Sequence, residues 1–165
     1  MKHLFSVNLI HFNLLSKLLL SYMPVLFFLG CSLNEPDPNC NIAEPVPFEA
    51  LEMDDVRCML QNTDENEEET SLIIENRGDF DNYISCNGEI SEIDFEDFFI
   101  LTGKTSLPSC GRLKNQEVSL NCGKIEYHVE IEKLVCHKPT DVFYFAVIPI
   151  AYREFPIEFK ITKDK

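Results

Sequence analysis

The stretch KIEYHVEIE, residues 124–132, alternates polar and apolar side chains without a break. Successive side chains on an extended strand point to opposite faces, so its four apolar residues gather on one face and its charged residues on the other. This pattern predicts a sheet with one buried face and one solvated face, which is typical of antiparallel sheets. Such a strand strongly constrains the fold, because a register shift of one residue would expose every apolar side chain.

Further segments have the character of strands. Residues 71–74 (SLII) and 98–101 (FFIL) predict short strands, and residues 141–150 (DVFYFAVIPI) form an unbroken apolar run typical of a central strand covered on both faces. Residues 154–162 alternate again with the apolar side chains inward, but Pro156 has no N–H to donate. We therefore expect this last strand to begin at Pro156 or to lie at a sheet edge.

Two segments predict short helices. Residues 48–61 (FEALEMDDVRCMLQ) carry apolar residues at roughly helical spacing, and residues 76–85 (NRGDFDNYIS) indicate a turn followed by a helix with Asp79 as its cap. The predicted fold class is α+β, a predominantly antiparallel β-sheet with one or two short helices, stapled by disulfides. We place the globular β-rich domain at residues 71–163.

The segment before that domain is strongly acidic. Residues 62–70 (NTDENEEET) hold five acidic residues and no apolar one, which predicts a solvated linker. The alternative is a hard-cation site built from carboxylates, although calcium loops need a glycine turn that is absent here. With the proline-rich residues 32–47, this linker and the first helix form a predicted tether over residues 31–70.

The charge balance narrows the partners. The formal net charge of the 165-residue chain is −14, so it would repel the phosphates of nucleic acid. We expect no nucleic acid partner. An anionic membrane surface would be repelled too, so membrane attachment needs something other than charge.

The N-terminus offers such an attachment. Residues 18–30 (LLLSYMPVLFFLG) form an apolar run of 13 residues preceded by Lys2 and Lys17, too short for the ~20 residues of a spanning helix. A short run with a basic lead is typical of a secretory signal peptide, here residues 1–30. The alternative is an uncleaved anchor over residues 4–30, which contains His, Asn and Lys side chains.

The residues that end this run resemble a known pattern. FLGC, residues 28–31, resembles the lipobox of bacterial lipoproteins, in which a small residue precedes an invariant cysteine. The resemblance implies that Cys31 becomes the acylated N-terminus of the mature protein and that cleavage follows Gly30. It also implies a lipid-anchored location in the bacterial cell envelope, with the outer membrane as the expected site.

The cysteine count fits an exported chain. Lipidation of Cys31 resolves the odd total of seven and leaves six cysteines, enough for three disulfides. These six are Cys40, Cys58, Cys86, Cys110, Cys122 and Cys136. Six cysteines allow 15 connectivities, so spacing alone leaves the pairing open.

One pairing follows from a predicted hairpin. A turn at residues 121–124 places Leu120 opposite Ile125, and extending that register brings Cys110 near Cys136, with one irregular residue near Lys133. We expect a Cys110–Cys136 disulfide. Cys40–Cys58 is a guess from their place before the acidic linker, and Cys86–Cys122 follows by elimination.

No motif in the sequence carries a recognisable chemistry. Glu126, His128 and Glu130 share one strand face and suggest a metal site, but this alternation is far more typical of a solvated face. The nucleophile elbow G-x-S-x-G and the phosphate-binding glycine loops are absent from the sequence. We therefore expect no catalytic residues, no cofactor and no metal.

A second resemblance concerns the domain itself. The segment from residue 72 to the last strand is similar to small lipoproteins of Bacteroidetes-type bacteria and to the C-terminal domain of protease-complex accessory proteins. The matching positions are Ile73, Ile74, Tyr83, Ile93, Asp94 and Phe95. Since most of these are core-type residues, the resemblance implies fold more than function.

These observations lead to one expected function and two rivals. We expect a non-catalytic binding or assembly module that contacts another envelope protein or a polysaccharide. The alternatives are a small hydrolase, protease inhibitor or accessory protein that uses surface carboxylates, and a purely structural role.

Overall fold

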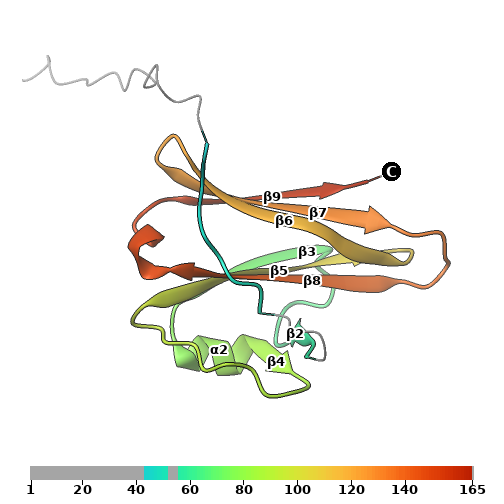
Figure 1. Cartoon of the computed structure of the whole chain (residues 1–165). Coiled ribbons are helices and arrows are strands. Elements are labelled where there is room, and N and C mark those ends of the chain that lie inside the picture. Colours follow the sequence, from blue (N-terminus) through green and yellow to red (C-terminus); the bar gives the residue numbers. More distant parts are fainter. Residues whose placement is uncertain (1–42, 52–55, 165) are drawn as a thin grey trace, which may run out of the picture. The chain divides into compact units, whose positions relative to one another are not determined.

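The computed structural model describes residues 43–51 and 56–164, and in them two main β-sheets face each other (Figure 1). The outer sheet has the strand order β1 (Glu44–Pro45), β6 (Gly111–Asn121), β7 (Lys124–Lys133) and β9 (Ile157–Lys163). The middle sheet has the order β3 (Glu69–Ile74), β5 (Phe98–Leu107) and β8 (Thr140–Pro149).

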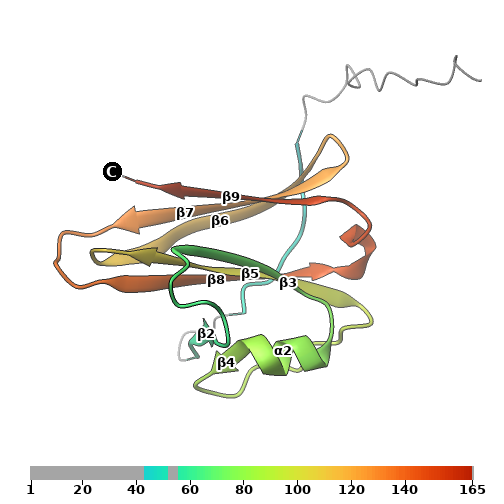
Figure 2. The ribbon, with the colours of Figure 1, turned by 180° about the vertical axis from the view of Figure 1, so that it is seen from behind.

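A third, smaller layer covers the far face of the middle sheet (Figure 2). It comprises helix α2 (Arg77–Tyr83) and the strand pair β2 (Cys58–Leu60) and β4 (Ile84–Cys86). A 3-10 turn, η1 (Ile150–Tyr152), joins β8 to β9. The predicted fold class is confirmed: the described chain is mostly β, mainly antiparallel, with one short helix and disulfides.

Two apolar clusters hold the three layers together. Between the two main sheets lie fully buried side chains of both, such as Tyr127 and Val129 from β7 and Phe99 and Tyr144 from the middle sheet. The opposite face of the middle sheet buries a second set against the covering layer: Leu51, Cys58, Leu60, Ile74, Phe80, Ile84, Ile100, Phe145 and Val147. The middle sheet is therefore buried on both faces, whereas the outer sheet has one solvated face.

The predicted hairpin forms with the expected register. Strands β6 and β7 pair Leu120 with Ile125 and Val118 with Tyr127. The turn needs left-handed backbone at Cys122 (φ 53°) and Gly123 (φ 71°), the pattern of a tight two-residue hairpin loop. The predicted irregularity near Lys133 is wrong, because the register shifts between Leu113 and Asn115 on β6.

Residues 48–61 do not form the predicted helix where they are described. Glu49 bridges Val147 of β8, and Cys58–Leu60 is a strand that pairs with β4. Cys58 and Leu60 are buried while Met59 is exposed, a period of two rather than of a helix. With Val46 and Leu51 also buried, these segments belong to the packed domain and not to a tether.

Two other details differ from the sequence-based expectations. Asn76, not Asp79, caps helix α2: its Oδ1 accepts the N–H of Asp79 at 2.9 Å. The apolar run of residues 141–150 forms β8, which pairs only with β5 in its sheet, so β5 is the central strand. The run in β8 is apolar because both faces of the sheet are covered, which does not require a central position.

The last strand lies at an edge, as predicted. Strand β9 begins at Ile157, directly after Pro156, and pairs with β7 in parallel orientation. The crossover through the middle sheet, which carries β8 and η1, makes this parallel pairing possible. Phe159 and Ile161 pack against the cluster between the main sheets, so the predicted inward face is correct.

Gly103, at the centre of β5, makes room for an aromatic ring. It lies opposite Tyr144 of β8, whose ring crosses the glycine towards β3. A Cβ atom at position 103 would lie 2.3 Å from the Tyr144 Oη and 2.5 Å from the backbone oxygen of Thr70. The glycine is therefore required by packing, since the backbone contact cannot move aside.

Substituting Gly103→Ala should destabilise the domain by about 2–4 kcal/mol, in line with overpacked core sites. Chemical denaturation of the full chain measures this change. Gly78→Ala is the matched control, because a Cβ there meets only the Asn76 Oδ1, at 3.2 Å, and no backbone atom. Equal effects of the two substitutions would contradict the packing explanation.

Two buried phenols face each other between the sheets. The Tyr127 and Tyr144 rings lie edge to face with centroids 5.8 Å apart, and the Tyr127 hydroxyl donates to the Gln116 Oε1 at 2.6 Å. Burial, together with the neighbouring Tyr144, raises the pKa of Tyr127 far above its ordinary value. Burial also raises the pKa of Tyr144.

Stability should therefore fall in alkaline solution. In the unfolded chain both phenols lose their protons near their ordinary pKa of about 10, whereas the folded chain keeps them protonated. The free energy of unfolding should be insensitive to these groups below pH ~10 and decrease above it, by about 1.4 kcal/mol per pH unit for Tyr127 while its phenol stays protonated in the folded chain. The raised pKa of Tyr144 adds to the decrease in the same direction. Tyr127→Phe should reduce that slope in denaturation experiments; an unchanged slope would contradict the assignment.

Candidate functional site

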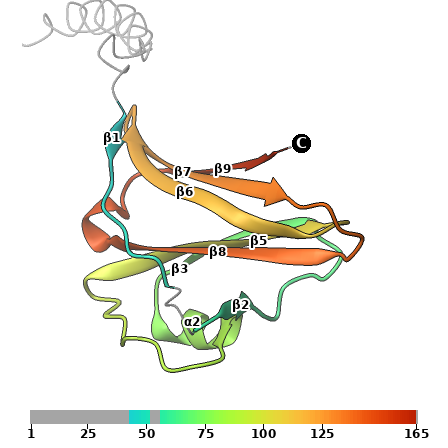
Figure 3. The ribbon, with the colours of Figure 1, turned by 45° about the vertical axis from the view of Figure 1, so that its right-hand side comes forward.

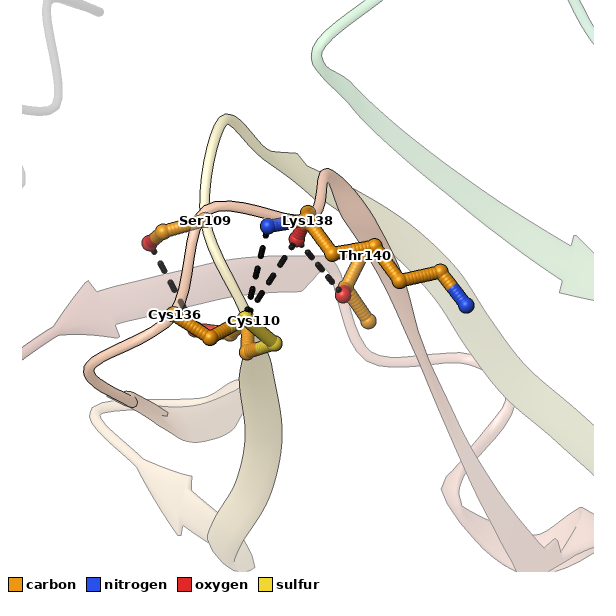
Figure 4. Close-up of a disulfide and its surroundings, with 5 residues drawn as sticks. All are labelled: Ser109, Cys110, Cys136, Lys138 and Thr140. Carbon is orange, nitrogen blue, oxygen red and sulfur yellow. Dashed lines mark hydrogen bonds between the residues drawn. A yellow bond between two sulfur atoms is a disulfide. The ribbon is translucent and has the colours of Figure 1, made fainter.

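One end of the sandwich combines a disulfide, exposed apolar side chains and cations. Strands β5 and β7 end there, and β6 and β8 begin there; we call it the loop end. A disulfide between Cys110 and Cys136 ties the two connecting loops, with Cα atoms 5.4 Å apart (Figure 4). The Lys138 N–H donates to the Cys136 Sγ at 3.4 Å, and the Thr140 hydroxyl donates to the Lys138 carbonyl at 3.3 Å.

A tight turn at the loop end projects an apolar side chain into solvent. The Leu134 N–H donates to the Cys110 carbonyl at 2.8 Å, and the Cys136 N–H donates to the Leu134 carbonyl at 3.0 Å. The second bond closes a three-residue γ-turn with Val135 at its centre. Val135 is consequently fully exposed, and Leu134 beside it is 39% exposed.

The same end holds cations that lack a carboxylate partner. Among the described residues, most lysines and arginines form ion pairs, including Lys114, Lys124 and Lys160 on the outer sheet. Within residues 43–51 and 56–164, Arg57, Lys133 and Lys138 form no ion pair within 4.0 Å. On a chain of net charge −14, three cations at one end without a carboxylate partner among the described residues are a local exception.

A shallow hollow of about 510 Å³ has Arg57 on its wall. Its walls come from three segments: Arg57–Met59 of β2, Gly111–Leu113 of β6 and Thr140–Phe143 of β8. Met59 is 50% exposed in this wall. We call Arg57, Met59, Lys133, Leu134, Val135 and Lys138, together with this hollow, the loop-end patch.

The acidic segment lies at the same end, beside the start of β3. The Ser106 N–H at the end of β5 donates to the Glu68 carbonyl at 2.8 Å. Lys104 is only 6% exposed, and its Nζ donates a hydrogen bond to the Asp64 carbonyl at 3.4 Å. Hydrogen bonds from Asn66 hold the pKa of the Asp64 carboxyl below its ordinary value. The segment is thus anchored to the domain while its carboxylates stay in solvent.

A second hollow lies near the start of α2. Carboxylates of Glu75, Glu92, Asp94 and Glu96 line it, together with Ile93 and Phe95. Two of these carboxylates have structural partners. Glu75 forms a bidentate pair with Arg153, at 2.8 and 2.6 Å, which lowers the pKa of Glu75. Asp94 accepts the Glu96 N–H at 2.9 Å and so closes a turn.

The candidate metal residues on β7 lie on the solvated face of the outer sheet. Glu126 pairs with Lys160 at 2.8 Å and Lys124 at 3.5 Å, and the bond from Lys160 lowers the pKa of Glu126. Glu130 faces Lys114 at 3.7 Å, and His128 lies 3.4 Å from the Thr162 hydroxyl. Within the described ranges, no group of three or more His, Cys, Asp or Glu side chains is arranged to hold a metal.

The disulfides correct part of the predicted connectivity. Cys110 and Cys136 are paired as the hairpin register suggested. Cys58 is bonded to Cys86, directly opposite on β4, so the expected pairs Cys40–Cys58 and Cys86–Cys122 are wrong. The physical reason is that β2 pairs with β4 in the covering layer, and this pairing brings Cys58 directly opposite Cys86. Cys122 is also in a disulfide.

Several predicted features fall outside the described residues. These are the signal peptide over residues 1–30, the lipidation site Cys31 and Cys40. Within residues 43–51 and 56–164, no helix has the length and apolar character required to cross a bilayer.

Sequence reasoning missed the loop-end patch. Residues 133–138 (KLVCHK) follow the alternating strand, and the only visible signal is that Leu134 and Val135 are adjacent and so break the alternation. The sequence predicts a helix that contains Arg57 and Met59, so nothing in it places them near Cys110. The patch becomes visible only once β2, β6 and β8 are brought together.

Comparison with protein-family models, with curated proteins and with solved structures finds no significant match to this chain. The candidate site therefore has to be interpreted from its own geometry.

The Cys110–Cys136 bond should matter for both stability and the turn. Its loop of 26 residues corresponds to about 3.5 kcal/mol in the loop-entropy description, and so does the Cys58–Cys86 loop of 28 residues to within ~0.1 kcal/mol. Replacing either pair by serines should lower the free energy of unfolding by about that amount, measured by chemical denaturation.

The two replacements should differ in one respect. Loss of Cys110–Cys136 should release the turn and make the chain cleavable by trypsin after Lys133; Lys138 precedes Pro139 and stays resistant. Loss of Cys58–Cys86 should leave the Lys133 site protected under native conditions. Equal trypsin sensitivity in the two double variants would contradict a locking role for the loop-end disulfide.

Proposed function

We propose that this protein is a lipid-anchored component of the bacterial cell envelope that acts as a non-catalytic binding module. The lipobox-like FLGC at residues 28–31 and the short apolar run before it support the anchor. The disulfides within the described domain agree with an oxidising compartment, since such bonds are rare in the cytosol.

The observation that carries the proposal is where the chain enters the domain. The first described strand, β1, pairs with Leu120 and Ser119 at the end of β6 next to the hairpin turn (Figure 3). The described part of the chain therefore begins at the hairpin end. Strand β6 runs from the loop end to the hairpin end over 11 residues, so the two ends lie about 35 Å apart.

This geometry suits a tethered binding module. An anchor attached at the hairpin end leaves the loop end accessible to a partner. Three ionisable groups of the described domain have pKa values shifted by structural contacts. Ion pairs with Arg153 and Lys160 lower the pKa values of Glu75 and Glu126, respectively. Burial between the sheets raises the pKa of Tyr127. Each shift thus has a structural cause.

Mass spectrometry of the protein from its native host tests the anchor. The expected mature chain begins at Cys31 and carries acyl groups on that residue. Cys31→Ala should leave the uncleaved precursor, and Ser32→Ala is the matched control that should be processed normally. Material that begins at Met1, or that has a free thiol at Cys31, would overturn the proposal.

A further inference from the structure

We propose that the loop-end patch binds an acidic protein segment that carries an aliphatic side chain. The proposal rests on the proposed function only in that the partner would be another envelope protein. Its physical basis is the patch itself, which combines exposed apolar groups, uncompensated cations and an adjoining hollow.

The apolar part of the patch is held in a fixed position. Val135 is fully exposed at the centre of a γ-turn whose neighbours are fixed by Cys110, through a hydrogen bond to Leu134 and the disulfide to Cys136. A side chain presented in this way loses little conformational freedom when a partner covers it, and preorganisation of this kind increases affinity. Val135 is therefore the expected apolar anchor.

The cations of the patch indicate that the partner carries negative charge. In the part of the chain that the structure describes, no carboxylate pairs with Arg57, Lys133 or Lys138 within 4.0 Å, in contrast to the paired lysines of the outer sheet. An acidic segment would supply the missing counter-charges. Because exposed charges are screened beyond ~8 Å at physiological ionic strength, this local positive group acts largely independently of the net charge.

The hollow fits an aliphatic side chain of the partner. Its volume of about 510 Å³ is bounded by Met59, Leu113, Val142 and Phe143, and the charged residues Arg57, Arg112 and Asp141 lie on its walls. The Asp141 carboxylate accepts the Ser106 hydroxyl at 2.6 Å. Arg112 is itself paired with Glu132 at 2.7 Å, so Arg57 is the arginine free to meet a ligand carboxylate. A ligand that places an aliphatic group in the hollow and a carboxylate beside Arg57 has the chemistry of an acidic peptide segment.

The surroundings favour a narrow segment over a flat anionic surface. The acidic segment from Asp64 to Glu69 is exposed at the same end of the sandwich, beside Ser106. A bilayer of anionic lipid that approached Val135 would also meet these carboxylates and be repelled. A single peptide strand can contact the cations of β2 and of residues 133–138 without approaching the acidic segment.

The test measures fluorescence anisotropy of a labelled synthetic peptide that alternates Leu with Glu and Asp. The full chain is used, in nonionic detergent and with disulfides intact. Binding should be saturable at or below about 1 mM peptide. It should weaken at least about tenfold when the acidic residues of the peptide become Gln and Asn, or when Leu becomes Gly.

Two sets of variants locate the binding. Val135→Asp and the pair Lys133→Glu with Lys138→Glu should each weaken binding by about tenfold or more. Ile73→Asp is the matched apolar control, since Ile73 is 40% exposed but lies on β3. Arg77→Glu with Lys160→Glu is the matched charge control, located on α2 and β9. Thermal unfolding of every variant verifies that it is folded.

Each outcome decides the proposal. Loss of binding in the patch variants, with binding retained in the controls, supports it. No saturable binding, or equal loss in patch and control variants, overturns it. Binding of the full chain to anionic phospholipid vesicles or to an acidic polysaccharide, in place of the peptide, also overturns it. Acylation of Cys31 does not affect this assay, so it fails or succeeds independently of the envelope proposal.

Discussion

The whole architecture depends on burying both faces of the middle sheet. Strands β5 and β8 are buried along almost their entire length and carry large apolar side chains on both faces, so neither face can remain in water. The apolar face of β7 and of the rest of the outer sheet covers one face of the middle sheet. The charged face of the outer sheet stays in solvent. The other face is closed by α2, β2 and β4, and Cys58–Cys86 joins the two strands of that layer.

The loop end follows from the same constraint. Covering the middle sheet brings β2 against the start of β8, and pairing β6 with β7 brings Cys110 to Cys136. Arg57 and Met59 therefore lie near a turn that is separated from them by about 75 positions in the chain. The charges of this surface differ from those of the outer sheet, where Lys124, Lys160 and their glutamate partners neutralise one another.

The sequence was sufficient for the features that depend on local pattern. Alternation at residues 124–132 predicts β7, and the turn at residues 121–124 predicts the hairpin register. That register places Cys110 near Cys136, as the disulfide confirms. It failed for β2, because a strand of three residues is too short to show a period of two within an apparently helical stripe. The parallel pairing of β9, the Cys58–Cys86 bond and the exposure of Val135 depend on contacts between distant segments, which spacing alone does not encode.

The central claim is that the protein is anchored at one end and binds a protein partner at the other. Photo-crosslinking in the native envelope, from a photoreactive residue at position 135, tests this claim most directly. The expected product is an adduct with an acidic, aliphatic-containing peptide of another protein, absent when Lys133 and Lys138 are reversed to glutamate and absent from position 73. Adducts with phospholipid, or equal adducts from positions 135 and 73, would contradict it.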